Sequence, residues 1–141
     1  MPALLRPYEV LAPGPGAVRR AFRFRRGRPD DGSRHVWQIN DEPFDPARML
    51  ATVRPGQVER WRFASDLHHP VHVHLARFQV LSRGSGGPGA ADGGWKDTVD
   101  LRPADDVEVA IRFPDLPGRY VMHCHNLEHE DMAMMAAFEV R

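Results

Sequence analysis

The segment that decides the fold and the chemistry of this chain reads His123-Cys124-His125-Asn126-Leu127-Glu128-His129-Glu130-Asp131-Met132-Ala133-Met134. It contains the only cysteine of the 141 residues, a histidine on each side of it, a third histidine five residues after it and a methionine five residues beyond that. One thiolate, imidazoles and a weak thioether are the ligand set of a blue-copper electron-transfer site. Zinc is the rival metal because it also binds cysteine and histidine, but the soft thioether favours copper.

A second histidine array lies upstream and reads His69-Pro70-Val71-His72-Val73-His74. Side chains alternate between the two faces of a strand, so residues two apart share a face and residues one or three apart lie on opposite faces. If both arrays are strands, Cys124 and His69 each lie on the face opposite to a His-x-His pair. These two residues, with His129 and Met134 from the following loop, can then close one mononuclear site.

The same alternation gathers the other four histidines of the arrays at a second location. They are His72, His74, His123 and His125. Because His123 and His125 flank Cys124, a short covalent path for electrons joins the two locations. The β-branched residues Val71, Val73 and Val121 support strand conformation in both arrays.

In these motifs the chain resembles the C-terminal cupredoxin domain of multicopper oxidases, in the branch of bacterial laccases, spore-coat laccases and cuprous oxidases. The resemblance begins at Val36-Trp37-Gln38-Ile39-Asn40, continues through Gly94-Trp95-Lys96-Asp97-Thr98 and includes the whole segment around Cys124. It implies an all-β fold, a single cupredoxin-like Greek-key sandwich or barrel over residues 1–141.

The resemblance also implies a role for each residue of the two arrays. By the family pattern, His69, Cys124 and His129 bind type 1 copper and Met134 is its axial ligand. His72 would bind the type 2 copper, and His74, His123 and His125 the type 3 pair. Met132 and Met135 are expected to serve packing instead.

Two acidic residues also receive roles. Glu130 matches the acidic residue thought to relay protons to the oxygen site. Asp97 lies in a stretch that matches the family, and we expect it to orient a histidine ligand from behind.

One departure from the family concerns the oxygen site. A full oxidase has two more His-x-His pairs from an N-terminal domain, and this chain lacks them. The remaining histidines, His35 and His68, belong to no such pair and are expected to be structural or at the surface. A single copy therefore carries one complete type 1 site and half of an oxygen-reducing site.

Three functions remain open. The first is a laccase-like oxidase that couples one-electron oxidation of phenolic or metal-ion donors to O₂ reduction, with a trinuclear site shared between identical subunits. The second is a type 1 electron carrier, and the third an inactive copper-binding fragment. Retention of all four interface histidines favours the first, and with it a homo-oligomer that contains a twofold axis, as a dimer or a larger assembly.

Composition excludes some partners and leaves the compartment open. Nineteen basic residues balance nineteen acidic ones, which argues against binding to nucleic acid or to a membrane surface driven by bulk charge. The arginine-rich stretch 19–28 is expected to be a solvated strand face. No signal peptide is apparent at Met1–Pro7, although relatives of this kind are often exported.

Apolar alternation and turn residues predict many short strands, as in a sandwich or barrel. We expect strands over 18–25, 35–39, 57–63, 69–81, 98–101, 107–113, 118–123 and 136–140. A short helix is expected within 126–133, and the segment 84–94, with six glycines, is expected to be a loop.

Overall fold

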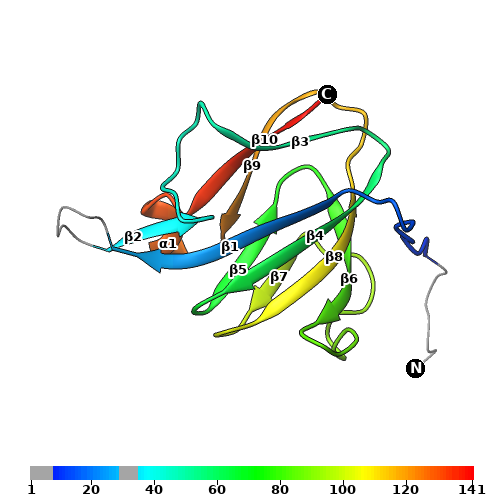
Figure 1. Cartoon of the computed structure of the whole chain (residues 1–141), viewed down its shortest axis with the longest axis horizontal. Coiled ribbons are helices and arrows are strands. Elements are labelled where there is room, and N and C mark those ends of the chain that lie inside the picture. Colours follow the sequence, from blue (N-terminus) through cyan, green and yellow to red (C-terminus); the bar gives the residue numbers. More distant parts are fainter. Residues whose placement is uncertain (1–7, 29–34) are drawn as a thin grey trace.

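Ten strands and one short helix make up the part of the chain that the computed structural model describes, residues 8–28 and 35–141 (Figure 1). The strands are β1 (Arg19–Gly27), β2 (Val36–Ile39), β3 (Met49–Val53), β4 (Val58–Ser65), β5 (His69–Val73), β6 (Arg77–Arg83), β7 (Thr98–Leu101), β8 (Asp106–Arg112), β9 (Gly118–Cys124) and β10 (Met135–Val140), and the helix is α1 (Leu127–Asp131). The expectation about a signal peptide concerns Met1–Pro7, which lies outside the described residues. Within those residues, no helix is long and apolar enough to cross a membrane.

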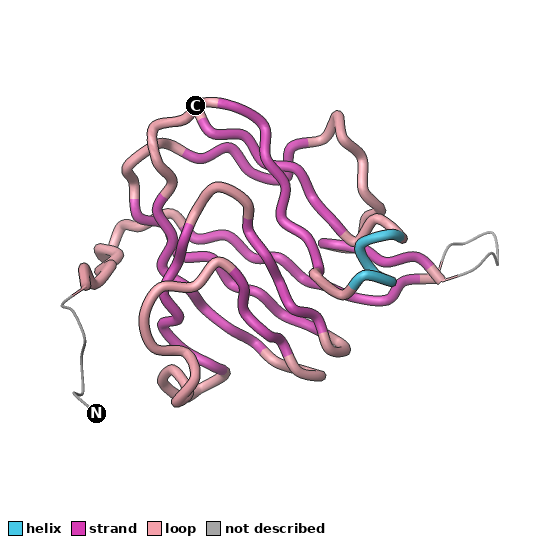
Figure 2. Tube along the Cα trace, turned by 180° about the vertical axis from the view of Figure 1, so that it is seen from behind, coloured by secondary structure: helices cyan, strands magenta, loops and turns pink. Residues whose placement is uncertain are grey.

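The strands form two five-stranded sheets that pack face to face. One has the order β2-β1-β4-β8-β6 and the other β3-β10-β9-β5-β7. The pairs β1–β4 and β3–β10 are parallel, and the other neighbours are antiparallel. Figure 2 shows α1 at the same end of the molecule as β2. The all-β sandwich expected from the sequence is confirmed.

An aromatic core fills the space between the sheets. In β4, Trp61 and Phe63 are fully buried while Arg62 between them is exposed, as the period of a strand with one solvated face requires. Trp61 meets Phe138 of the opposite sheet edge-on, with ring centroids 5.8 Å apart. Burial of each such side chain contributes about 1.5–3 kcal/mol. This core fixes the sheets against each other, and with them the strand ends that carry the histidines.

The expected long strand over 69–81 is wrong, because the chain changes sheet in its middle. β5 ends at Val73 and β6 begins at Arg77, and the two strands belong to different sheets. Leu75 adopts φ 70°, and the amide of Ala76 donates to the His74 carbonyl at 2.9 Å, which makes a tight three-residue turn. The apolar alternation shifts by one residue at Leu75-Ala76, but a β-bulge within one strand produces the same shift, so the pattern alone does not reveal a change of sheet.

β3 is a strand that the pattern did not predict. It lies at an edge of its sheet and pairs only with β10, among the described strands. This segment therefore forms a strand because it pairs with β10, and its local sequence alone does not indicate one. The other expected strands are present with shifts of one or two residues at their ends, and Thr98–Leu101 has the expected bounds.

Candidate metal centres

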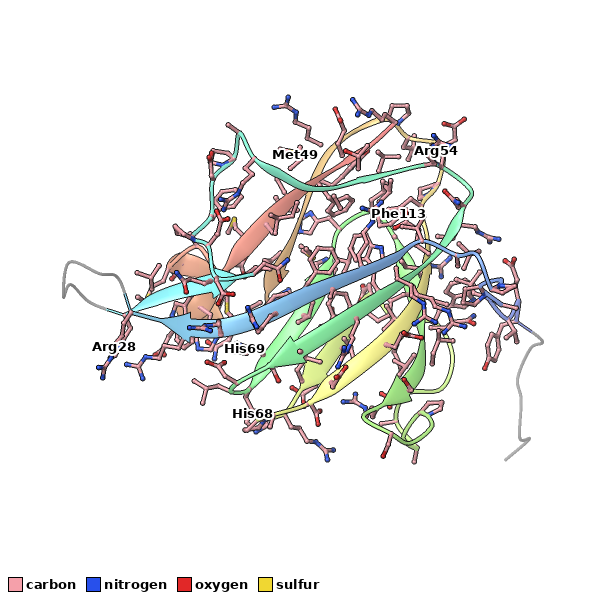
Figure 3. The ribbon with its side chains drawn as sticks, viewed as in Figure 1. Arg28, Met49, Arg54, His68, His69 and Phe113 are labelled. Carbon is pink, nitrogen blue, oxygen red and sulfur yellow. The ribbon has the colours of Figure 1, made fainter. Side chains whose placement is uncertain are left out.

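The first candidate centre is a triangle of donor atoms from β5, β9 and α1. Cys124 Sγ lies 3.3 Å from His129 Nδ1 and 3.6 Å from His69 Nδ1, and the two nitrogens lie 3.2 Å apart. An ion at the centre of such a triangle would be about 2 Å from each donor, close to ordinary metal–nitrogen and metal–sulfur bond lengths. The three side chains are buried. His69 stands at the start of β5 beside the exposed His68 (Figure 3).

Local structure positions His129. Asn126 caps α1, because its side chain accepts a hydrogen bond from the amide of Glu128 at 3.1 Å. The amide of His129 itself donates to the Asn126 carbonyl at 3.0 Å. This single turn of helix brings His129 back over the strand that ends at Cys124.

Met134 is fully buried, and its main chain joins the other two parts of the centre. Its carbonyl accepts from the Cys124 amide at 3.0 Å, and its amide donates to the His129 carbonyl at 2.8 Å. Met132 is 49% exposed, and Met135 lies in β10 opposite His123. Of these three methionines, Met134 is the one held to both Cys124 and His129.

Asp66 orients His69, a role that the sequence pattern did not single out. His69 Nε2 donates to Asp66 Oδ1 at 2.9 Å, so Nδ1 carries the lone pair that faces Cys124. The other oxygen, Oδ2, accepts from the amide of Arg26 at 2.7 Å. Burial alone would raise the pKa of Asp66, but the hydrogen bonds from Arg26 and His69 hold it below its ordinary value. The only sequence signal was an acidic residue three positions before a histidine.

Burial sets the protonation of the donors. It lowers the pKa of both His69 and His129, which leaves their imidazoles neutral and able to bind a cation. Burial raises the pKa of the Cys124 thiol to about 11. A metal ion must therefore displace a proton from Cys124 to bind as a thiolate complex.

The second candidate centre contains the other four array histidines. The ligand atoms of His72, His74 and His123 lie within 4.8 Å of one another, and His74 Nε2 is 3.1 Å from His123 Nε2. The ring of His125 lies 5.4 Å from that of His123 and 5.7 Å from that of His72. Burial and the neighbouring imidazoles lower the pKa of His74. The structure thus brings together each of the two groups expected from strand alternation.

Asp97 and Glu130 both lie beside this second group. His72 Nδ1 donates at 3.0 Å to the main-chain carbonyl of Asp97, and Thr98 Oγ1 lies at the same distance. Asp97 therefore meets a histidine through its backbone and not through its carboxylate. Glu130 Oε2 lies 3.6 Å from His123 Nδ1, and its side chain is 34% exposed, so it spans from the cluster to solvent.

The remaining histidines lie at the surface, as expected. His35 is exposed, and His68 is exposed with Nδ1 4.0 Å from Asp100 Oδ1. In the arginine-rich stretch 19–28, Arg23 and Arg25 contact Asp41 on the outer face of the sheet, whereas Arg20 pairs with the buried Glu59.

Comparison with known proteins agrees with this geometry. The bilirubin oxidase of Albifimbria verrucaria is 40% identical over 98% of this chain, and the laccase of Bacillus subtilis is 33% identical over 81% of it. The chain spans 24% and 26% of those two proteins, about a quarter of their length. The structure of the McoA multicopper oxidase of Aquifex aeolicus superimposes with a TM-score of 0.77 at 31% identity, over 95% of this chain and 32% of that one. The family model of multicopper oxidases matches residues 19–141. The chain therefore belongs to the multicopper oxidase family, whose cofactor is copper.

Proposed function

We propose that this chain is a copper-dependent oxidoreductase that, like a laccase, takes single electrons from phenolic or metal-ion donors and passes them to a site of O₂ reduction. The observation that carries the proposal is the pair of donor clusters joined by the peptide His123-Cys124-His125. One cluster offers a thiolate with imidazoles, and the other offers imidazoles alone. These donor sets suit electron uptake and oxygen binding respectively.

In the first centre, His69, Cys124, His129 and Met134 would hold type 1 copper. Copper supplies one-electron redox chemistry when bound. The protein's part is to keep the donors in place: Asp66 fixes the ring of His69, and α1 fixes His129. Burial of all four side chains excludes water from the centre.

In the second centre, His72 would serve a type 2 copper, and His74, His123 and His125 a type 3 pair. Reduction of O₂ to water consumes protons as well as electrons. Glu130, between solvent and His123, is suited to hold and release a proton there.

Four imidazoles are half of the set that a trinuclear site needs, so we further propose that a second copy of the chain supplies the rest. His72 and His74 are partly exposed and His125 is exposed, so this group faces outward and is open to a partner. A twofold axis would place the same four histidines of a second subunit opposite them, because an isologous interface uses one surface twice. Copper shared between subunits would stabilise such an assembly by mass action.

The test combines colour, copper content and oxygen uptake. The wild type should be blue and lose that colour in Cys124→Ser, because the thiolate-to-copper charge transfer is lost. A dimer with one shared cluster should hold about two and a half copper ions per chain. His72→Ala and His125→Ala should abolish oxygen consumption with a phenolic donor yet stay blue. His68→Ala, at the surface, should stay blue and keep consuming oxygen.

A type 1 electron carrier is the second candidate, favoured because the His69–Cys124–His129 triangle lies wholly within one chain. A blue monomer with one copper ion per chain and no oxygen uptake would establish this function in place of the oxidase. A colourless copper-loaded chain would contradict both.

A further inference from the structure

Trp37 contacts both imidazoles of the first centre. Its ring lies on that of His129 with centroids 3.7 Å apart and planes inclined by 36°. It also meets His69 edge-on, with centroids 5.7 Å apart at 81°. Among the described residues, no other aromatic pair of this chain has so short a centroid separation. The indole is therefore in direct π contact with a donor ring whose Nδ1 faces Cys124.

The donor atoms of this centre are shielded from any reductant in solution. His69, Cys124 and Met134 have no exposed surface, and His129 is 8% exposed. An electron that arrives from outside must therefore enter through the narrow exposed edge of His129 or through a side chain that contacts a donor ring. Trp37 is only partly buried and belongs to β2, an edge strand of four residues. It reaches from the molecular surface to His129.

Two exposed apolar side chains flank His129 in the sequence, together with the exposed acids Glu128 and Asp131. Leu127, two residues before it, is 72% exposed, and Met132, three residues after it, is 49% exposed. The indole itself favours a planar aromatic molecule, because such rings stack on tryptophan.

We propose that a planar aromatic reductant docks against Trp37 and that its electron crosses the indole to His129; this inference rests on the proposed type 1 site. The reductant loses one electron, and a phenol also releases its proton to water. Copper(II) gains that electron and becomes copper(I). No bond to Trp37 forms or breaks, because the indole serves as the medium of transfer and is not itself oxidised.

The experiment measures reduction of the copper-loaded full chain without oxygen, so that O₂ does not reoxidise the copper while it bleaches. Hydroquinone is mixed rapidly with the blue protein, and the second-order rate constant of bleaching is recorded. Trp37→Leu should slow bleaching about tenfold, the effect of about 1.4 kcal/mol in the barrier. Trp37→Phe, which keeps a ring beside His129, should retain most of the rate. Trp95→Leu, a half-buried tryptophan beneath Arg77, is the matched control and should not change it.

Two further readouts separate electron transfer from simple packing. The blue absorbance and the reduction potential should be almost the same in Trp37→Phe and wild type. In wild type, copper loading should quench a tryptophan emission that Trp37→Phe lacks, because the indole is in contact with a copper ligand. A Trp37→Leu variant that bleaches at the wild-type rate, or whose slower rate is fully explained by a changed potential, would overturn the proposal. A wild type that never turns blue would overturn the type 1 site and this inference with it.

Discussion

Three histidines of the two centres, His69, His72 and His123, are oriented by an acceptor on the far side of the ring. Nε2 of His69 donates to Asp66, which leaves Nδ1 for the metal side. In His72 and His123 the roles are reversed, since Nδ1 contacts the carbonyls of Asp97 and Cys124 respectively, which leaves Nε2. The tautomer of each ring thus follows from an acceptor on its far side. Asp66 is the one carboxylate among these acceptors, since His72 contacts a backbone carbonyl and the Thr98 hydroxyl and His123 contacts a backbone carbonyl.

Asp66→Ala should weaken copper binding at the first centre by roughly 10–100-fold, the usual cost of losing a group that supports a metal ligand. His69 would lose the acceptor that fixes its ring, and the Arg26 amide would lose its partner. Competition with a copper chelator, followed by the blue absorbance, measures the affinity. Asp100→Ala, which removes the carboxylate beside the exposed His68, is the matched control. Equal affinities for the two variants would contradict the role given to Asp66.

Met134→Leu should leave the protein blue and raise its reduction potential. A thioether bound weakly along the axis stabilises copper(II) more than a non-coordinating leucine does. Leucine has a volume close to that of methionine, so the buried site should still pack. Redox titration of the blue absorbance gives the potential, with Met135→Leu as the neighbouring control. A shift in Met135→Leu and none in Met134→Leu would show that the wrong methionine had been assigned.

At the scale of elements, the sequence predicted what local patterns control and missed what distant contacts control. Thr98–Leu101 alternates over its whole length and has clear ends, so its bounds could be predicted. α1 could be predicted near its place because Asn126 is a good helix cap. The turn at Leu75 and strand β3 could not, because a change of sheet and an edge pairing depend on residues far along the chain. The role of Asp66 could not be predicted either, because its partner Arg26 lies 40 residues away along the chain.

Asn126→Ala should destabilise the metal-free protein by about 1 kcal/mol, the usual value of a helix cap. The Glu128 amide would lose its acceptor, and the turn that carries His129 would fray. For a chain of this size the melting temperature should fall by about 4 °C, which thermal unfolding followed by circular dichroism can measure. Asn126→Ser keeps a capping oxygen and should lie close to wild type. If serine and alanine were equally destabilising, the cap would not be the cause.

In the whole molecule, sheet β3-β10-β9-β5-β7 holds both centres. β5 and β9 are neighbours in it, with Val71 paired to Cys124 and His72 to His123. Residues on opposite faces of each strand therefore contribute to different centres: His69 and Cys124 to the first, and His72 and His123 to the second. This explains why one cysteine can be bound in the first centre while the residues on either side of it lie in the second. The arrangement needs only two adjacent strands, which is why strand alternation could predict it.

The buried donors also couple the stability of the metal-free protein to pH on both sides of neutrality. The pKa values of His69 and His129 are lowered from 6.5, so below pH 6.5 the unfolded chain takes up protons that the folded chain does not. Their contribution to stability is complete above pH 6.5 and is lost as pH falls through the folded values. For Cys124 the sign is opposite: its pKa is raised from 9.0 to about 11, so its contribution is complete below pH 9.0 and is lost as pH rises towards 11.

The free energy of unfolding in urea should therefore have a plateau between about pH 6.5 and 9 and decline on either side. Cys124→Ser should lose the alkaline decline, because serine does not ionise in this range, while the acidic decline should remain. Copper should remove the alkaline decline in the wild type as well, because the metal already holds the sulfur as a thiolate. Unfolding curves at a series of pH values, with and without copper, test this. An alkaline decline that is unchanged in Cys124→Ser would show that another group causes it and that Cys124 is not buried as a protonated thiol.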